Sequence, residues 1–212
     1  MGWTIGNFAL SQTQMDANAV EVYKYFSGKG WTLNAIAGIL GNMQSESYIN
    51  PGVWQSLIAG NYSGGFGLVQ WTPATNYTNW ATANGYGITD PNGQLYWIDA
   101  LSASTGQWIP TGAYNMSWNA FKTSGQSAEY LASAFLKNFE RAGVEVESTR
   151  RTQARYYYNL LSQYDTNSKA IESAVQWAIG IANDNSHGYD QNNRWGPDYD
   201  CSSLLITAWQ QA

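Results

Sequence analysis

The chain contains 212 residues, enough for one or two domains with a sizeable hydrophobic core. Only 12% of the residues are charged and 44% are hydrophobic, which is typical of a globular protein rather than a disordered one. The net charge of −5 argues against non-specific binding of nucleic acids, because that binding needs a basic surface.

The N-terminus and the cysteine content exclude further classes. The first residues lack the basic stretch and apolar run of a secretory signal, and no segment approaches the roughly 18 apolar residues of a membrane span. The single cysteine, Cys201, cannot form an internal disulfide, and with His187 as the one histidine it makes a zinc site improbable. We therefore expect no membrane insertion, no metal and no cofactor.

Hydrophobic periodicity predicts an α+β protein that is mainly α. A glycine-rich stretch, residues 63–71, predicts a short strand or β-hairpin. The remaining elements of the first domain are helices, and Thr32 is expected to cap the second of them. These helices are predicted over residues 16–26, 32–46, 93–103, 127–140 and 145–164.

The polar residues 165–168 predict a linker between a first domain, residues 1–164, and a second segment, residues 169–212. That segment begins with an amphipathic helix, continues in a turn-rich loop and ends in a helix that starts at Cys201. Roughly 45 residues are too few to bury an independent core of ordinary stability.

Glu46 is the first candidate for chemistry. The apolar residues Leu33, Ile36, Leu40 and Met43 recur at helical spacing, and the same row continues to Glu46. A carboxyl at the end of a buried helical face is partly desolvated, which favours its protonated form. Such a group suits acid-catalysed cleavage of a glycosidic bond. Without the neighbouring glycine-rich stretch, a solvated helix-end carboxylate is the favoured interpretation.

The glycine-rich stretch supplies the second wall of a predicted cleft. Its backbone amides around residues 64–67 can donate to a substrate, and the amide of Gln70 can hydrogen-bond a sugar. Trp71 and Trp54 can stack on sugar rings. Of the chain's 11 Trp and 15 Tyr, however, we expect most to pack in the core.

Glu46-Ser47 with Asn50-Pro51, followed by GLVQW at 67–71, is similar to the pattern of goose-type lysozymes and soluble lytic transglycosylases. Four stretches carry a closer resemblance, which covers residues 10–164: 31–38, 41–47 (GNMQSES), 66–75 and 135–141. Together they resemble the phage tail lysozymes, the wall-degrading domains at the tail tips of phages that infect Gram-positive bacteria.

This resemblance implies a lysozyme-like helical domain that cleaves peptidoglycan between N-acetylmuramic acid and N-acetylglucosamine. It implies that Glu46 is the general acid. The substrate-binding residues that we expect opposite it are Phe66, Gly67, Gln70, Trp71 and Trp54. The resemblance also implies delivery in the virion tail tip, with peptidoglycan and phage tail proteins as partners.

A second catalytic carboxylate stays open between Asp90, Asp99, Glu129 and Glu140. A retaining glycosidase places its two carboxyls about 5–5.5 Å apart and an inverting one about 6.5–9.5 Å apart, distances that a sequence does not give. Glu140 next to Arg141 favours a structural ion pair. Some relatives in the superfamily act with one glutamate.

Cys201 is the candidate nucleophile of an incomplete second domain. A cysteine that opens a helix faces the positive end of the helix dipole, which favours the thiolate, but a small apolar residue on a face with Leu204 and Leu205 is as good an interpretation. The stretch resembles the start of papain-like NlpC and CHAP amidases of phages. In that fold the partner histidine follows the cysteine, whereas His187 precedes it. We therefore expect no amidase activity from this chain.

The leading hypothesis is a phage glycosidase used during virus entry. Three alternatives remain: an endolysin held in the host cytoplasm until lysis, a lytic transglycosylase, and a wall-binding module without catalysis. A fourth, in which the cysteine amidase is the working enzyme, is disfavoured by the missing histidine.

Overall fold

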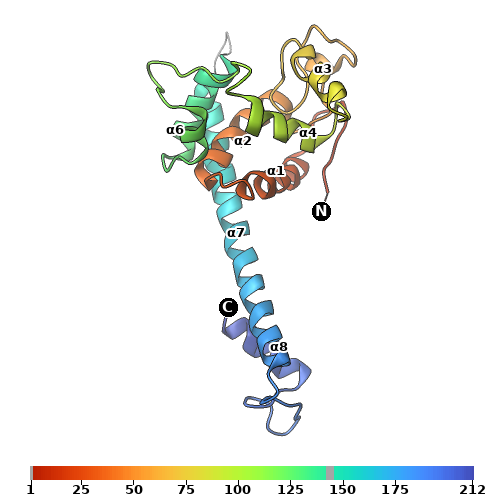
Figure 1. The fold of residues 1–212 in the computed structure, drawn as a ribbon, viewed down its shortest axis with the longest axis vertical. Coiled ribbons are helices and arrows are strands. Elements are labelled where there is room, and N and C mark those ends of the chain that lie inside the picture. The colour runs from red at the N-terminus through yellow and green to blue at the C-terminus, as the bar shows by residue number, and fades with distance from the viewer. Residues whose placement is uncertain (1, 142–145) are drawn as a thin grey trace. The chain divides into compact units, whose positions relative to one another are not determined.

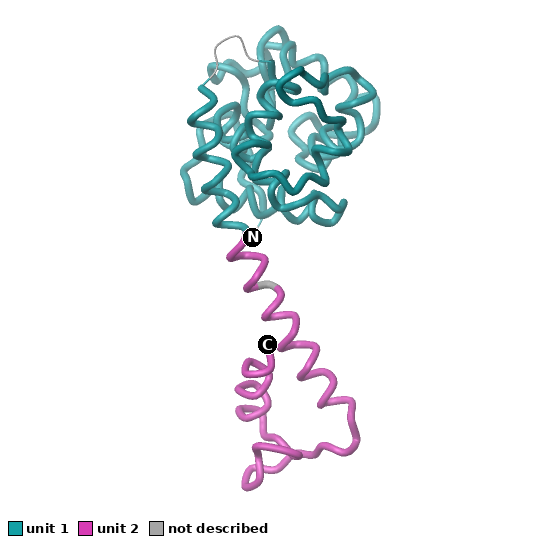
Figure 2. Tube along the Cα trace, turned by 90° about the vertical axis from the view of Figure 1, so that its left-hand side faces the viewer, with its two compact units in different colours: residues 1–161 teal, residues 162–212 magenta. Residues whose placement is uncertain are grey.

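The computed structural model describes residues 2–141 and 146–212 and consists of helices and loops (Figure 1). Two compact units divide the chain, Met1–Leu161 and Ser162–Ala212 (Figure 2). The helices are α1 (Gln12–Ser27), α2 (Leu33–Ser47), η1 (Gln55–Leu57), α3 (Thr75–Ala83), α4 (Pro91–Tyr96), η2 (Trp97–Leu101), α5 (Trp118–Lys122), α6 (Ala128–Phe135), η3 (Leu136–Glu140), α7 (Glu147–Asn183) and α8 (Cys201–Gln210).

Helix α2 is the central element of the first unit. The Thr32 hydroxyl accepts a hydrogen bond from the Ala35 amide at 3.2 Å, which confirms the predicted cap. Every residue from Ala35 to Met43 is buried, and α2 packs against α1, α5 and α6 (Figure 1). The helix ends at Tyr48, which adopts a left-handed conformation with φ of 57°.

The core of the first unit is rich in aromatic rings. Trp118 stacks on Phe121 with centroids 5.3 Å apart, and Phe135 stacks on Phe139 at 4.3 Å. Trp31 and Trp108 pack at the edges of the same group and are 5% exposed. These residues therefore pack in the interior, as expected for most of the aromatic residues.

Two predicted features of the backbone are wrong. Residues 63–71 form a loop with isolated bridges from Phe66 to Trp54 and to Trp71, rather than a β-hairpin. The predicted linker, residues 165–168, lies inside α7, which continues to Asn183 without a break. The units nevertheless divide at Leu161, close to the predicted domain end at residue 164.

The other predicted helices are confirmed. Residues 93–103 correspond to α4 and η2, residues 127–140 to α6 and η3, and the last helix begins at Cys201. The short helices α3 and α5 were not predicted. No helix in residues 2–141 and 146–212 combines the length and the apolar character that crossing a membrane requires.

Candidate active site

Glu46 lies in the last turn of α2, and its side chain is 19% exposed. One carboxylate oxygen, Oε1, accepts a hydrogen bond from Nη2 of Arg150 at 2.5 Å. The same guanidinium donates through Nη1 to Oδ1 of Asn42 at 3.1 Å. Glu46 is thus partly buried, as its position in the helical row predicted, and it is held by a cation from α7.

A glycine on α2 allows this contact. At Gly41 an added Cβ would lie 2.7 Å from the backbone nitrogen of Ala154, closer than a real Cβ approaches such an atom. Helices α2 and α7 therefore meet backbone to backbone, and Arg150, one turn before Ala154, reaches Asn42 and Glu46. Arg150 is 7% exposed.

The loop opposite α2 is held by side-chain amides. Gln70 adopts φ of 47° and donates through Nε2 to the carbonyls of Val53, at 3.2 Å, and Gly67, at 3.1 Å. Gln94 accepts from the Leu68 amide at 2.8 Å. At Gly67, with φ of 76°, an added Cβ would lie 2.7 Å from Gln94 Oε1, so the loop needs glycine there.

A cavity of about 640 Å³ lies between α2, this loop and the end of η3. Its lining is mostly polar, and it brings together three predicted site residues: Glu46, Gln70 and Trp71. The full lining comprises Glu46, Gln55, Gly65, Val69, Gln70, Trp71, Thr72, Asn76, Gln107, Phe139, Glu140 and Arg141.

Glu140 is the second carboxyl of this cavity. Its Oε1 is shielded from solvent and has no hydrogen-bond partner in the described part of the chain. Burial first, and then the negative charge of Glu46, raise the pKa of Glu140 well above its usual range, against the opposing charges of Arg150 and Arg141. The carboxyl therefore retains its proton at pH values at which an exposed glutamate has lost it.

The predicted ion pair between Glu140 and Arg141 is not present among the described residues. Arg141 instead donates through Nη1 to the carbonyl oxygens of Gln107, at 2.5 Å, and Asn138, at 2.8 Å. These bonds fix the guanidinium to the loop before α5 and to the last turn of η3. Glu140 is thereby left without a hydrogen-bonded cation.

The other candidates for the second carboxylate lie outside this cavity's lining. Asp90 caps α4 by accepting from the Asn92 amide at 2.9 Å. Asp99 accepts from the Trp31 indole at 2.9 Å and from Lys122 at 3.0 Å. Glu129 forms an ion pair with Arg155. Each of these carboxylates therefore has a structural role that accounts for its position.

Trp71 lines the cavity although it is only 3% exposed. One face stacks on Tyr77 with centroids 4.5 Å apart, and its Nε1 is buried without an acceptor in the described residues. Trp54, Phe66 and Gly67, also predicted to bind substrate, do not line the cavity. Trp54 and Phe66 are 7% and 0% exposed and pack on each other at 4.4 Å.

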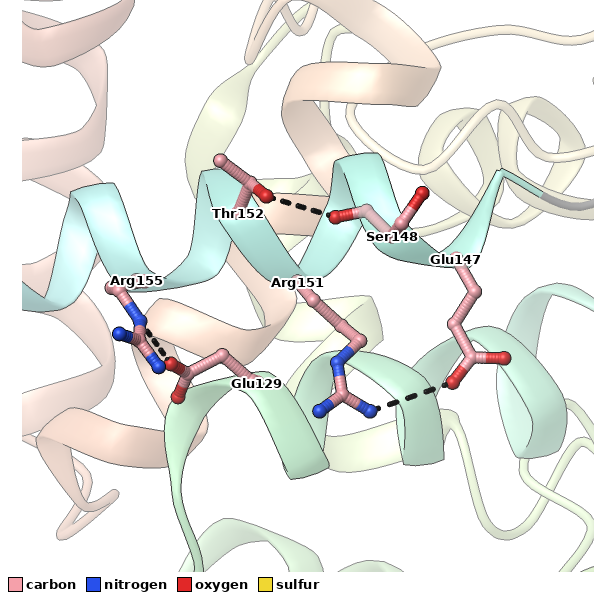
Figure 3. Close-up of a pocket in the computed structure, with 6 residues that line it drawn as sticks. All are labelled: Glu129, Glu147, Ser148, Arg151, Thr152 and Arg155. Carbon is pink, nitrogen blue, oxygen red and sulfur yellow. Dashed lines mark hydrogen bonds and ion pairs between the residues drawn. The ribbon is translucent and has the colours of Figure 1, made fainter.

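A second hollow of the first unit lies along α7 and holds residues with opposite charges (Figure 3). Arg155 pairs with Glu129, and Arg151 lies 3.8 Å from Glu147. Glu147 also accepts from the Ser133 hydroxyl at 2.6 Å. Because its charges neutralise one another, this hollow offers no free acid or base, and the Glu46 cavity is the stronger candidate.

In the second unit Cys201 is exposed at the first position of α8. Asp200 caps that helix by accepting from the Ser203 amide at 2.7 Å. His187 contacts the Pro197 carbonyl and lies 3.7 Å from Asp184, and no hydrogen bond joins it to Cys201 in the part of the chain that is described. A cysteine–histidine pair is therefore not assembled here.

The sequence did not single out Arg150 as part of the site. Its role follows only from its hydrogen bonds to Asn42 and Glu46 on α2. Gln55, Asn76 and Gln107 were missed as well, because they come from η1, α3 and a loop that lie apart in the chain. Glu140 was one of four open candidates for a second carboxylate, and its neighbour Arg141 favoured a structural ion pair instead.

Comparison with known proteins shows the family of this chain. The family model of the phage tail lysozymes matches residues 17–161, which includes Glu46, Gln70, Trp71, Glu140 and Arg150. The chain is also 46% identical over 156 residues to morphogenesis protein 1 of Bacillus phage B103. That alignment covers 74% of this chain and 42% of the relative, so the chain spans less than half of that protein's length. The chain belongs to the phage tail lysozyme family.

Proposed function

We propose that this protein is a peptidoglycan-degrading glycosidase of a phage, with Glu46 as its general acid. The observation that carries the proposal is the polar cavity that Glu46 shares with Gln70, Trp71 and Glu140. A glycosidase needs an acid beside the scissile bond and donors for the sugar substituents, and this cavity offers both. The family membership supports the same substrate.

In the proposed reaction a glycan strand enters the cavity, and Glu46 donates a proton to the glycosidic oxygen as the bond to the anomeric carbon breaks. Trp71 Nε1 supplies a buried donor for a sugar substituent. The Gln70 amide and the backbone at Gly65 help to position the strand. Because one face of Trp71 already stacks on Tyr77, its indole edge rather than that face is the part that binds sugar.

We further propose that the substrate is a Gram-positive wall and that the protein acts from the virion tail during entry. The relative in a Bacillus phage is named as a morphogenesis protein, which supports a role in the particle rather than in host lysis. An endolysin, a lytic transglycosylase and a wall-binding module remain the alternatives. The two carboxyls in one cavity favour catalysis over binding alone.

For the second unit we propose the start of a papain-like amidase that has no activity in this chain. Cys201 lacks a hydrogen-bonded histidine among the described residues, and a cysteine nucleophile of this kind works with such a base. The expected result is that purified walls release no free amino groups in a Cys201-dependent manner. A release that disappears in Cys201→Ser would contradict this expectation.

The test of the proposed function is Glu46→Gln, which keeps the shape of the side chain and removes its proton transfer. We expect the variant to fold, with some loss of stability because Arg150 loses its charged partner, to keep its binding to purified walls, and to clear wall suspensions at least about 100-fold more slowly. Glu147→Gln, in the separate hollow of Figure 3, is the control and should clear walls normally. Clearing by Glu46→Gln at the normal rate would refute the assignment.

A further inference from the structure

The cavity contains a second carboxyl whose surroundings point to chemistry rather than to support. Glu140 Oε1 is shielded from solvent and has no hydrogen-bond donor, and Arg150 Nε is buried without an acceptor, within the described residues. A buried polar atom without a partner costs about 1–3 kcal/mol of stability, so a fold that only needed packing would place apolar groups there. Both unpaired atoms belong to residues that act electrostatically on each other.

The charged groups that face Glu140 come from three described places. Glu46 lies on α2, Arg150 on α7, and Arg141 adjoins Glu140 in the chain. Arg150 donates to Glu46 and not to Glu140, and Arg141 donates to carbonyl oxygens. In this arrangement the guanidinium of Arg150 is bound to Glu46, while burial and the charge of Glu46 raise the pKa of Glu140, so that Glu140 keeps its proton to higher pH than an exposed glutamate.

We propose that Glu140 is the catalytic base that acts with Glu46, and that the two carboxyls share one proton which changes sides in each turnover. The proposal rests on the proposed function, since it names the partner of the general acid in the same cavity.

The proton balance is as follows. Before cleavage Glu46 is protonated and Glu140 is the carboxylate. Glu46 gives its proton to the glycosidic oxygen, the bond between that oxygen and the anomeric carbon breaks, and Glu140 takes a proton from a water molecule as the water oxygen bonds to the same carbon. Afterwards Glu46 is the carboxylate and Glu140 is protonated, and transfer of the proton from Glu140 back to Glu46 restores the starting state.

Arg150 provides a physical reason why the two states can exchange. Its guanidinium binds the Glu46 carboxylate, while its charge also stabilises the ionised form of Glu140. A shift of the guanidinium from Glu46 toward Glu140 would satisfy the unpaired Nε and Oε1 atoms and would favour the proton on Glu46. The shared cation therefore allows either carboxyl to be the charged one.

The first test is Glu140→Gln in the full chain. A variant without the base should clear walls at least about 100-fold more slowly at the wild-type optimum, with wall binding retained. The pH profile should also change. Wild type needs one proton on the pair and loses rate on both sides of its optimum, whereas Glu140→Gln should lose the acid-side decline and keep the alkaline one.

A chemical rescue separates a base from a merely structural residue. In Glu140→Ala, azide should fill the vacated space, attack the anomeric carbon and yield a glycosyl azide that mass analysis detects. Glu129→Gln, whose side chain lies outside the cavity, is the control and should behave as wild type with or without azide. If Glu140→Gln does not fold, Glu140→Asp takes its place. That variant should keep both the acid-side and the alkaline decline of the pH–rate profile, with a reduced rate, and should form no azide product.

The inference is overturned if Glu140→Gln clears walls at the normal rate. It is also overturned if Glu140→Gln is slow but keeps both the acid-side and the alkaline decline of the rate, and Glu140→Ala forms no azide product. The third contradicting result is a set of wild-type products that end in anhydro sugars without added water. In each case Glu46→Gln must still abolish clearing. If Glu46→Gln is fully active, the proposed function itself fails.

Discussion

Arg150 is the residue on which the charge distribution of the cavity depends. It is 7% exposed, binds Glu46 and Asn42, and acts on Glu140. The position of Glu46 at the end of a buried helical row was visible in the sequence, because helical spacing is a local property. Arg150 lies more than 100 residues later, and only the contact between α2 and α7 shows its role.

Removal of this guanidinium should destabilise the first unit. Arg150→Met leaves Glu46 and Asn42 without their donor, and hydrogen bonds to charged groups contribute about 1.5–3 kcal/mol each. We expect the free energy of unfolding in urea to fall by at least that amount. Arg155→Met is the matched control on the same helix, because its side chain is 73% exposed and its ion pair should contribute at most about 1 kcal/mol. Equal losses in both variants would contradict the role of Arg150.

The raised pKa of Glu140 has a consequence for stability. In acid, both the folded and the unfolded chain hold this proton, so the ionisation of Glu140 does not change the free energy of unfolding there. As pH rises above the usual glutamate range, the unfolded chain releases the proton first, so the free energy of unfolding falls until the folded pKa is passed. Glu140→Gln should therefore raise the melting temperature at pH 8 and leave it unchanged at pH 3.

Glu129 is the control, because its contribution to the free energy of unfolding should change with pH in the opposite direction. Burial raises its pKa, but the backbone hydrogen bond and Arg155 outweigh that effect and lower it overall. Its contribution to stability is present above the usual glutamate range and lost in acid, so Glu129→Gln should lose stability at pH 8 and not at pH 3. A pH-independent effect of Glu140→Gln would show that Glu140 ionises normally.

At the scale of elements, α2 positions Glu46, the proposed acid, because its glycines let neighbouring helices approach. Its length, its cap and its buried face follow from the sequence, since caps and periodicity are local signals. The loop over residues 63–71 was mistaken for a hairpin because glycines next to Phe66 and Trp71 are typical of both structures. Tertiary contacts of Gln70 and Gln94 decide between them.

The close approach at Gly41 can be tested directly. In Gly41→Ala the new methyl meets Ala154 in α7, and overpacking of this kind costs about 1–3 kcal/mol, more than the helix propensity of alanine returns. Gly180→Ala, also inside a helix, has no atom within 4 Å of the new methyl and should not lower stability. Melting curves of the two variants give the comparison. A Gly41→Ala protein as stable as wild type would mean that the helices are less tightly packed.

At the scale of the whole molecule, the candidate active site and the main core belong to one unit. The cavity lining lies within Met1–Leu161, and the buried hydrophobic cluster extends from Leu10 to Leu161. The sequence predicted the end of the first domain at residue 164, and the compact units divide after Leu161. It did not reveal that α7 continues through that point, because the polar residues 165–168 are compatible with an exposed helix as well as with a linker.

A shortened chain tests this division. A protein of residues 1–164 keeps the whole cavity and the core cluster, so we expect it to fold and to clear walls at close to the full-length rate. Circular dichroism and a turbidity assay give the comparison. Loss of folding or of clearing would show that the second unit is needed by the first.

The central claim is that the cavity of Glu46 and Glu140 cleaves glycan strands, and mass analysis of the fragments released from purified peptidoglycan tests it most directly. We predict fragments cut between sugars, with one water molecule added per cut, and no such fragments from Glu46→Gln. Intact glycan strands released with newly free amino groups, or sugar fragments that persist in Glu46→Gln, would contradict the claim.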